Sequence, residues 1–524
     1  MYFFFLFPPS TGHETIRIFA YAYHIYVLLK EIIMRKMKSM AAACLLACSL
    51  VFAGGVGAYA EDAAKAPWEQ DAPKMGSLTI KKLKDGKTNE TPVAGAEFTV
   101  KKVIAAGEEP ALDLTKQSDW AKLAKKVDSY NNGTETPNFD TPKTMTTSDK
   151  GEAKFNSLEI GIYQVTESKV PAGYSSDVKP FYITIPQILN GANVSKDPVY
   201  KYDVEVKPKN KDVTSLIKKT ADTSKTVVAG DDISYTIEAG VNKNKEGNNN
   251  VDLTKDDLMD YAVFDDAPTD AFDNISGDNV KKVMIGGEEL TKNTHYTIDK
   301  EDKGSNVTRL TVKFTDAGLT KIAEKVNAKA ESKVTVNLTF TIKSSITSNE
   351  FTNKSGFVPG HGKDEPKSPE VVPTKPDGGE DPNPKTVLRN FQIKKVSAKS
   401  STTMLQGAKF KLFADKTEAE KCAKDTTQCD GASKFGEKST DAQGMTDKVK
   451  AIVGKDFWVV EVEAPKEYAR SNQPTKVNIK ENDVTDPYVV TIQNLPKADS
   501  GLWFNLPKTG ATGVIIFALA GLAL

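Results

Sequence analysis

Three short segments place a polar residue on a strand face that is otherwise apolar. Because successive strand residues point to opposite faces of a sheet, alternate residues share one face. The segments at 391–395, 457–461 and 490–494 each present two apolar side chains on such a face. They are followed on that face by Lys395, Glu461 and Asn494, respectively. An unpaired lysine or glutamate on a core face costs roughly several kcal/mol, so we expect these three side chains to meet.

A lysine, an asparagine and a carboxylic acid in a dry core can react with one another. Burial lowers the pKa of the amine and raises the pKa of the acid. The neutral amine of Lys395 can then attack the carboxamide carbon of Asn494, while Glu461 polarises the carbonyl and shuttles protons. Ammonia leaves and an isopeptide bond remains. Proximity of well-oriented groups supplies up to roughly 7–11 kcal/mol of the barrier reduction. The alternative is a solvated Lys–Glu pair on an edge strand.

The same alternation marks two further trios. In the middle of the chain it selects Lys219, Asn353 and the acid Asp265, with Lys218 as the alternative nucleophile. An aspartate replaces the glutamate there. Nearer the N-terminus the trio comprises Lys82, Asn210 and the acid Glu167. We therefore expect one intramolecular bond in each of three regions.

One lysine beside the first trio has the opposite orientation. Val204 and Val206 face the core with Asn210, so Lys209 faces outward. Pro208 cannot donate to a strand ladder, which predicts that the strand ends here. An outward amine at a domain edge can reach another molecule, whereas the inward lysines cannot. The alternative is that Lys209 is one solvated lysine among many.

The elements that must position these residues are short strands. Alternating segments recur between Gly, Asn, Asp and Pro turns, which predicts β-sandwiches; examples lie at 77–82, 97–102, 181–185, 233–239, 333–342 and 489–493. Short helices are expected at 118–127, 316–330 and 418–424. The fold class is all-β, with three tandem Ig-like sandwiches in an elongated chain.

Composition shifts and internal repeats divide the chain. Residues 78–83 match 391–396, and 93–98 match 405–410, so the first and third domains are related. The stretch at 356–385 holds seven prolines and is expected to be a linker or an extended edge. We expect the following parts: a leader at 1–60, domains at 61–210, 211–356 and 387–500, a linker at 357–386, and a C-terminal signal at 501–524.

The leader is typical of a secretory signal peptide. A basic segment at 35–38 precedes an apolar run at 40–57 and a small-x-small site at 58–60, which predicts cleavage after Ala60. A true start at Met34 or Met37 is expected. The alternative is a membrane anchor.

The C-terminal signal resembles the LPxTG cell-wall sorting motif of Gram-positive surface proteins. The motif consists of Leu506, Pro507, Lys508, Thr509 and Gly510, and apolar residues 511–524 follow it. The resemblance implies that a sortase cleaves between the threonine and the glycine and passes the threonine carbonyl to an amine. Members of that family usually end in a basic cluster, which this sequence does not show, and the sequence leaves open whether its C-terminus is truncated.

The domains also resemble known modules. Residues 163–174 closely match the E-box of collagen-adhesin B-type domains, and residues 457–468 give a looser copy. Residues 217–222, 230–237 and 261–265 resemble the A-type domain. The resemblance implies Lys–Asn isopeptide bonds in both types of domain, with an aspartate as the helper acid in the A-type.

Residues 200–209 resemble the pilin motif W-x-x-x-V-x-V-Y-P-K, although Tyr200 replaces the tryptophan and Lys207 replaces the tyrosine. The mature chain is thus similar to a Spa-type major, or backbone, pilin. That resemblance implies that a class C sortase joins Thr509 of one subunit to Lys209 of the next, giving a covalent pilus shaft at the cell surface. Implied partners are identical subunits, a housekeeping sortase, minor pilins, peptidoglycan and host-cell receptors. The alternative function is a singly wall-anchored adhesin that binds host matrix.

Composition excludes several other classes. With 70 Lys+Arg and 70 Asp+Glu the net charge is zero, which argues against a nucleic-acid binder. After the leader only His295, His361, Cys422 and Cys429 remain for metal or Cys–His chemistry, so we expect no metal, no cofactor and no enzyme such as a hydrolase. The two cysteines predict a disulfide, with zinc as the weaker alternative. The acidic segment at 243–274 is expected to be a solvated loop rather than a calcium site.

Overall fold

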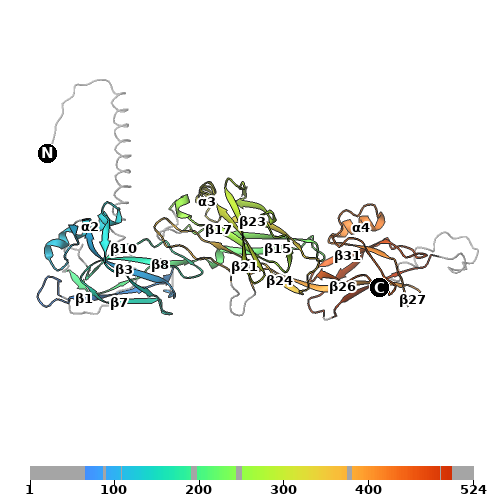
Figure 1. Cartoon of the computed structure of the whole chain (residues 1–524), viewed down its shortest axis with the longest axis horizontal. Helices are drawn as coiled ribbons and strands as arrows, with labels where there is room; N and C mark the ends of the chain where they lie inside the picture. The colour runs from blue at the N-terminus through green and yellow to red at the C-terminus, as the bar shows by residue number, and fades with distance from the viewer. Residues whose placement is uncertain are drawn as a thin grey trace, which may run out of the picture.

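The computed structural model describes residues 65–497 except 87–89, 108, 190–197, 244–250, 374–380 and 484. The expected signal peptide and sorting motif both lie outside the described residues. Strands dominate, and the sheets follow one another along a long axis (Figure 1). The prediction of an elongated, all-β chain is confirmed. Among the described helices, none is long and apolar enough to span a bilayer.

The first group of sheets lies between residues 75 and 212. One sheet has the order β13-β1-β7, and a larger one has the order β10-β8-β3-β4, with β5 and β6 also paired to β3. Their apolar faces enclose a core that includes Leu78, Phe98 and Val165. The strands are β1 (Met75–Lys81), β3 (Glu97–Ala106), β4 (Glu109–Pro110), β5 (Pro137–Phe139), β6 (Lys143–Thr146), β7 (Glu152–Glu159), β8 (Gly161–Lys169), β10 (Phe181–Ile185) and β13 (Asp203–Val206).

Smaller sheets and one helix complete this group. The short strands are β2 (Leu83–Lys84), β9 (Tyr174–Ser175), β11 (Gln187–Leu189), β12 (Val199–Lys201) and β14 (Lys209–Asp212). They pair as β2-β14-β9 and β11-β12. Helix α2 (Gln117–Asn131) covers the position predicted at 118–127.

A proline divides one long edge of the first group. Strand β13 runs parallel to β1, and β14 continues in the same direction beside β2. Pro208 lies between β13 and β14, because it has no N–H to donate to the ladder. Lys82 lies between β1 and β2, at the matching break in the partner strand. The two breaks place Lys82 beside the strand that carries Asn210.

The second group of sheets lies between residues 217 and 358. One sheet has the order β15-β16-β23-β19-β20, with β18 also on β23, and the other has the order β21-β22-β17-β25. Every second residue of β23 is buried, as the alternation predicts. The strands are β15 (Ile217–Asp222), β16 (Asp232–Ala239), β17 (Ala262–Pro268), β18 (Phe272–Asp273), β19 (Val280–Ile285), β20 (Glu288–Glu289), β21 (Tyr296–Gly304), β22 (Val307–Phe314), β23 (Val334–Ile342) and β25 (Lys354–Val358).

Helix α3 (Asp316–Ala328) packs on this second group. The hydroxyl of Thr315 accepts a hydrogen bond from the Gly318 amide and caps its first turn. Its buried residues Leu319, Ile322 and Val326 recur at helical spacing. Three 3₁₀ turns, Thr214–Leu216, Lys255–Asp257 and Gly277–Asn279, connect strands.

The third group lies between residues 385 and 494 and also includes β24 from the preceding segment. Its first sheet has the order β24-β26-β27, with β30 and β33 also paired to β26, and its second has the order β29-β28-β31-β32. Helix α4 (Lys416–Lys424) begins after Asp415, whose side chain accepts from the Glu418 amide. The strands are β24 (Glu350–Thr352), β26 (Lys385–Ser397), β27 (Ser400–Met404), β28 (Lys409–Phe413), β29 (Lys438–Ser439), β30 (Val449–Ile452), β31 (Asp456–Glu463), β32 (Thr475–Asn478) and β33 (Tyr488–Asn494).

The middle and third groups interpenetrate where they meet. Strand β24 pairs with the start of β26. Leu388 and Ile452 belong to the apolar core of the middle group. Conversely, Val227 and Val228 are fully buried in the core of the third group. The Ile452 amide also donates to the Val227 carbonyl, 2.8 Å away.

The proline-rich stretch is an extended edge over its first part. The Phe357 amide donates to the Val371 carbonyl at 3.0 Å, and the Val371 amide donates back at 2.8 Å. Val371 lies in the core of the middle group. Arg309 on β22 also reaches Glu370, with 2.6 Å between Nη1 and Oε1. Residues 357–373 are therefore packed against the middle group rather than forming a free linker.

Candidate functional site

The third group brings Lys395, Glu461 and Asn494 together in its core. Lys395 on β26 and Asn494 on β33 lie on adjacent parallel strands, and Glu461 comes from β31 in the facing sheet. The amine Nζ lies 3.0 Å from Glu461 Oε1 and donates to Asn494 Oδ1 at 2.5 Å. Asn494 Nδ2 donates to the same Oε1 at 2.7 Å. The amine, the amide and the carboxyl group thus touch one another pairwise.

The surroundings of this trio are dry. The side chains of Lys395 and Glu461 are 0% and 1% exposed. The Lys395 amine lies 5.5 Å from the centre of the Phe410 ring. Burial lowers the pKa of Lys395, and the attraction of Glu461 opposes this only in part. A lowered pKa increases the neutral, nucleophilic fraction of the amine.

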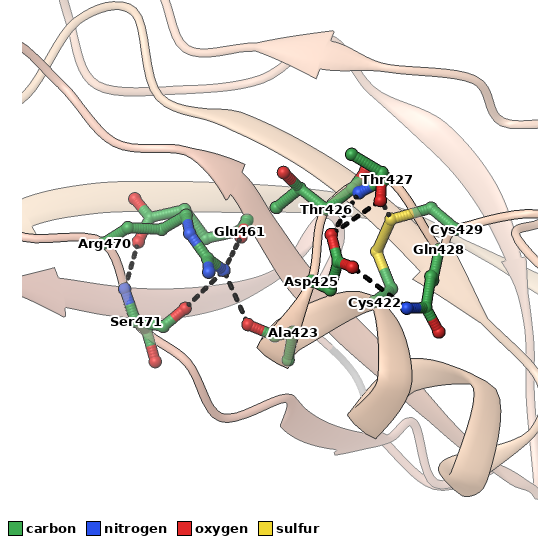
Figure 2. The surroundings of a disulfide bond; sticks show 10 residues. All are labelled: Cys422, Ala423, Asp425, Thr426, Thr427, Gln428, Cys429, Glu461, Arg470 and Ser471. Carbon is green, nitrogen blue, oxygen red and sulfur yellow. Dashed lines mark hydrogen bonds between the residues drawn. A yellow bond between two sulfur atoms is a disulfide. The ribbon is translucent and has the colours of Figure 1, made fainter.

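Loop residues hold the glutamate in place. The Ser471 amide donates to Glu461 Oε2 at 2.9 Å. Figure 2 shows the Arg470 guanidinium between three backbone carbonyls, those of Ala423, Glu461 and Ser471, at 2.8, 3.1 and 3.0 Å. Sequence reasoning missed Arg470 and Ser471, because they lie in a loop where alternation carries no signal.

The predicted disulfide between Cys422 and Cys429 is present in the structure. It joins the end of helix α4 to the following loop (Figure 2). Both cysteines are buried with Phe413 and Val460 in a small apolar cluster. The bridge therefore closes a short loop on the face of β31 that lies away from the main core.

The first group brings Lys82 and Asn210 together through Glu167, which bridges them, while Asn210 Oδ1 has no hydrogen-bond partner among the described residues. Lys82 Nζ donates to Glu167 Oε2 at 2.9 Å, and Asn210 Nδ2 donates to Oε1 at 2.8 Å. The Ser176 hydroxyl also donates to Oε2 at 2.6 Å. Phe98 lies 5.4 Å from the Lys82 amine. Burial lowers the pKa of Lys82 despite its contact with Glu167.

The two trios share one strand register. Ile492 lies opposite Lys395, so Asn494 is two residues farther along the parallel partner. In the first group Leu83 lies opposite Lys209, so the preceding Lys82 falls opposite Pro208. Asn210 is again two residues farther along the parallel partner. Parallel pairing with this offset places an amide beside an amine.

The middle group brings Lys219, Asp265 and Asn353 together with looser contacts. Lys219 Nζ donates to Asp265 Oδ2 and, at 3.0 Å, to the Lys354 carbonyl. Asn353 Nδ2 is 3.5 Å from that same Oδ2. Burial lowers the pKa of Lys219 and raises the pKa of Asp265. The alternative nucleophile, Lys218, is exposed on the opposite face of β15.

Lys209 lies on the surface, next to the buried Asn210. The neighbouring Lys207 is bound by Glu90, with 2.9 Å between Nζ and Oε1. Lys209 itself makes no ion pair or hydrogen bond through its amine with any residue in the described ranges. Among the described residues, the Lys209 amine is therefore unpaired, whereas the neighbouring Lys207 amine forms an ion pair with Glu90. The residues expected to supply the other half of the linkage, Leu506 to Gly510, lie outside the described part of the chain.

Comparisons with known proteins find relatives of parts of this chain and of most of its length. Residues 76–197 and 389–494 match a family described as SpaA, prealbumin-like fold domain. Two regions of the chain are thus similar to SpaA prealbumin-like domains. The first matched region contains Lys82 and Glu167 but ends before Asn210, whereas the second contains the whole trio of the third group.

Full-length relatives extend the likeness across the chain. Fimbrial subunit type 2 of Actinomyces naeslundii is 26% identical over 515 residues, which covers 86% of this chain and 87% of the relative. Fimbrial subunit type 1 of Actinomyces viscosus is 27% identical over 485 residues, covering 84% and 85%. The full-length major pilin SpaD from Corynebacterium diphtheriae has a similar fold, with a TM-score of 0.52 at 22% identity over 82% of this chain and 99% of SpaD. The expected resemblance to Spa-type pilins is confirmed.

Proposed function

We propose that this protein is the structural shaft subunit of a covalent pilus on the cell surface. A class C sortase would join the Thr509 carbonyl of one subunit to the Lys209 amine of the next. The fimbrial relatives support a secreted, structural role rather than an enzymatic one. The polymer is head-to-tail, because each subunit contributes a carbonyl from its C-terminal signal and an amine from its first domain.

The observation that carries this proposal is the pair Lys209 and Asn210. Adjacent in sequence, they point to opposite sides of β14, so that the amine is exposed and the amide is buried. A sortase acyl-enzyme approaching from solvent can reach Lys209. It cannot reach Lys82, whose side chain is 0% exposed.

The buried trios have a second role in this proposal. In each, the neutral lysine Nζ attacks the asparagine Cγ, a C–N bond forms, and the Cγ–Nδ2 bond breaks with loss of ammonia. The nearby carboxyl group carries the amine proton to the leaving nitrogen. The resulting bonds would be Lys82–Asn210, Lys219–Asn353 and Lys395–Asn494. Each is formed once, so the reaction is maturation and not turnover.

The remaining partners follow from this assembly. A housekeeping sortase would attach the finished fibre to peptidoglycan, minor pilins would join the same shaft, and host-cell receptors would meet its surface. The three sheet groups would correspond to domains at 61–210, 211–356 and 387–500.

Immunoblots of cell-wall extracts test the linkage. Lys209→Ala is expected to remove the ladder of high-mass polymers and leave single subunits. Lys207→Ala is the matched control, because that amine is engaged with Glu90, and it should leave the ladder intact. A full ladder in Lys209→Ala would contradict the proposed linkage. A single band in the wild type would instead indicate a singly anchored adhesin.

A further inference from the structure

The middle trio is surrounded by buried oxygens that have no hydrogen-bond partner among the described residues. They are Tyr235 Oη, Asp265 Oδ1, Asn353 Oδ1, Ser355 Oγ and Thr386 Oγ1. Strand pairing places several of them close together, since Asp265 lies opposite Ser355, and Thr386 lies opposite Phe351, two residues before Asn353. Leaving buried polar atoms unpaired is unfavourable and unusual. These five oxygens lie in or beside the middle trio, whereas the first trio has one such oxygen among the described residues, Asn210 Oδ1.

An aromatic ring lies beside the lysine of each trio, and it is a phenylalanine in the outer trios and a tyrosine in the middle one. Phe98 lies 5.4 Å from the Lys82 amine, and Phe410 lies 5.5 Å from the Lys395 amine. The corresponding ring in the middle group is Tyr235, whose centre is 4.8 Å from the Lys219 amine. The middle trio is therefore the one whose aromatic neighbour carries a hydroxyl.

The helper acid in the middle trio is also the shorter one. In the outer trios the asparagine Nδ2 lies 2.8 and 2.7 Å from a glutamate oxygen. In the middle trio Asn353 Nδ2 is 3.5 Å from Asp265 Oδ2, the oxygen that already accepts from Lys219. An aspartate side chain is one methylene shorter than glutamate. Asp265 thus holds Asn353 less closely and leaves the amide to be oriented by another group.

Tyr235 is placed to be that group. It lies on β16 with 1% of its surface exposed, and its ring packs 6.1 Å from both Phe272 and Phe340. Its hydroxyl faces the side chains of Thr386 and Asn353 without hydrogen-bonding to either in the structure, and burial raises its pKa, so that it stays protonated. A protonated phenol can donate a hydrogen bond.

Resting on the isopeptide chemistry of the proposed function, we propose that the Tyr235 hydroxyl donates to Asn353 Oδ1 during formation of the Lys219–Asn353 bond. When Nζ attacks Cγ, the carbonyl electrons move onto Oδ1, and the hydroxyl stabilises that negative charge. Asp265 takes a proton from the attacking amine and gives it to Nδ2. The carbonyl re-forms, the Cγ–Nδ2 bond breaks, and ammonia leaves. Tyr235 keeps its proton throughout.

Pulse-labelling of the full-length chain in cells that assemble the pilus tests this role. Samples are quenched in denaturant, and the crosslinked peptide that joins Lys219 to Asn353 is quantified against time. Tyr235→Phe keeps the ring and removes only the hydroxyl. It is expected to slow this crosslink by about 100-fold, the effect of losing one oxyanion donor. The Lys395–Asn494 crosslink in the same molecules serves as an internal reference and should form at the wild-type rate.

A second buried tyrosine of the same group provides the matched control. The Tyr261 hydroxyl donates to the carbonyls of Ala239 and Gly240, both at 3.2 Å, and touches no member of the trio. Tyr261→Phe should leave the crosslink rate unchanged. Equal slowing in the two variants, or a wild-type rate in Tyr235→Phe, would overturn the role of Tyr235. Absence of the crosslink in the wild-type chain would instead overturn the proposed middle bond, and the role of Tyr235 with it.

Discussion

The first and third groups contain the same buried trio, but only one of them carries an exposed lysine beside it. In the first, Asn210 is preceded by the exposed Lys209, whereas in the third, Asn494 is preceded by the exposed Gln493. The two domains thus have the same three residue types in the buried trio, but they differ in the exposed residue that precedes the asparagine. The comparison suggests that a bond formed inside the first domain also fixes the strand that presents an amine outside.

Removing the two asparagines separates these roles and should give the largest effects. Asn210→Ala and Asn494→Ala are each expected to abolish the crosslink in their own domain, because no carboxamide remains. Only Asn210→Ala should also cause a several-fold loss of polymer, since the short strand β14 then loses its covalent anchor. Peptide mapping and wall-extract immunoblots measure the two results. Equal polymer in both variants would show that the inner bond does not support the linking lysine.

Removing the helper acid from the third domain should cause the next largest effect. Glu461→Ala leaves the Lys395 amine buried without its partner carboxyl group. Glu461 also assists the proposed Lys395–Asn494 bond, so the comparison is made in the uncrosslinked Asn494→Ala background. There, leaving the buried lysine without its partner destabilises by about 3–5 kcal/mol. Chemical denaturation followed by a probe in the third domain measures the loss. The matched change Glu167→Ala, made in the Asn210→Ala background, should destabilise the first domain similarly, and a small effect in either would argue against a dry site.

Opening the disulfide should have a smaller effect that is confined to the third domain. Cys422 and Cys429 are seven positions apart, and closing so short a loop contributes about 2–3 kcal/mol by the chain-entropy model. The double variant Cys422→Ser, Cys429→Ser is expected to show this loss under denaturation. Polymer formation should be unchanged, because the first domain contains no part of this bridge.

The smallest expected effect is a change in pH dependence. In Asn494→Ala the Lys395 amine stays unreacted, and burial lowers its pKa below the ordinary 10.5. Between the two pKa values the unfolded chain binds the proton more tightly, so stability rises with pH. The slope is at most about 1.4 kcal/mol per pH unit.

The double variant Lys395→Met, Asn494→Ala is the control for this slope, since it lacks the amine. Thermal unfolding of both variants between neutral pH and pH values near the ordinary lysine pKa measures the difference. Parallel curves for the two variants would contradict a lowered pKa for Lys395.

Alternation along strands accounts for much of what the sequence could predict. It located the buried positions of Lys82, Lys219 and Lys395, because two apolar neighbours on the same face fix the orientation of each lysine. It favoured Lys219 but left Lys218 as an alternative, and the structure places Lys218 on the exposed face of β15. The helix predictions at 118–127, 316–330 and 418–424 agree with α2, α3 and α4 for the same reason, since periodicity is strong over several turns.

Contacts made by loops could not be predicted in this way. Ser176 and Ser471 reach the helper glutamates from segments without periodicity. The prolines at 356–385 suggested a linker or an edge and could not decide between them. Val371 decides it, because its backbone pairs with Phe357. Val227 and Val228 form too short an apolar pair to indicate which domain buries them.

That pair has a mechanical consequence for a fibre. Rotating the middle and third domains relative to each other would draw Val227 and Val228 out of one core and Leu388 and Ile452 out of the other. At the junction with the first domain, the Val213 amide donates to the Gly173 carbonyl at 3.0 Å, and Asn242 contacts Ser175 at 3.1 Å. No described residue before Val213 enters either of those two cores. Under tension, flexing would concentrate near Val213, and a pilus of such subunits would behave as stiff rods joined by regularly spaced hinges.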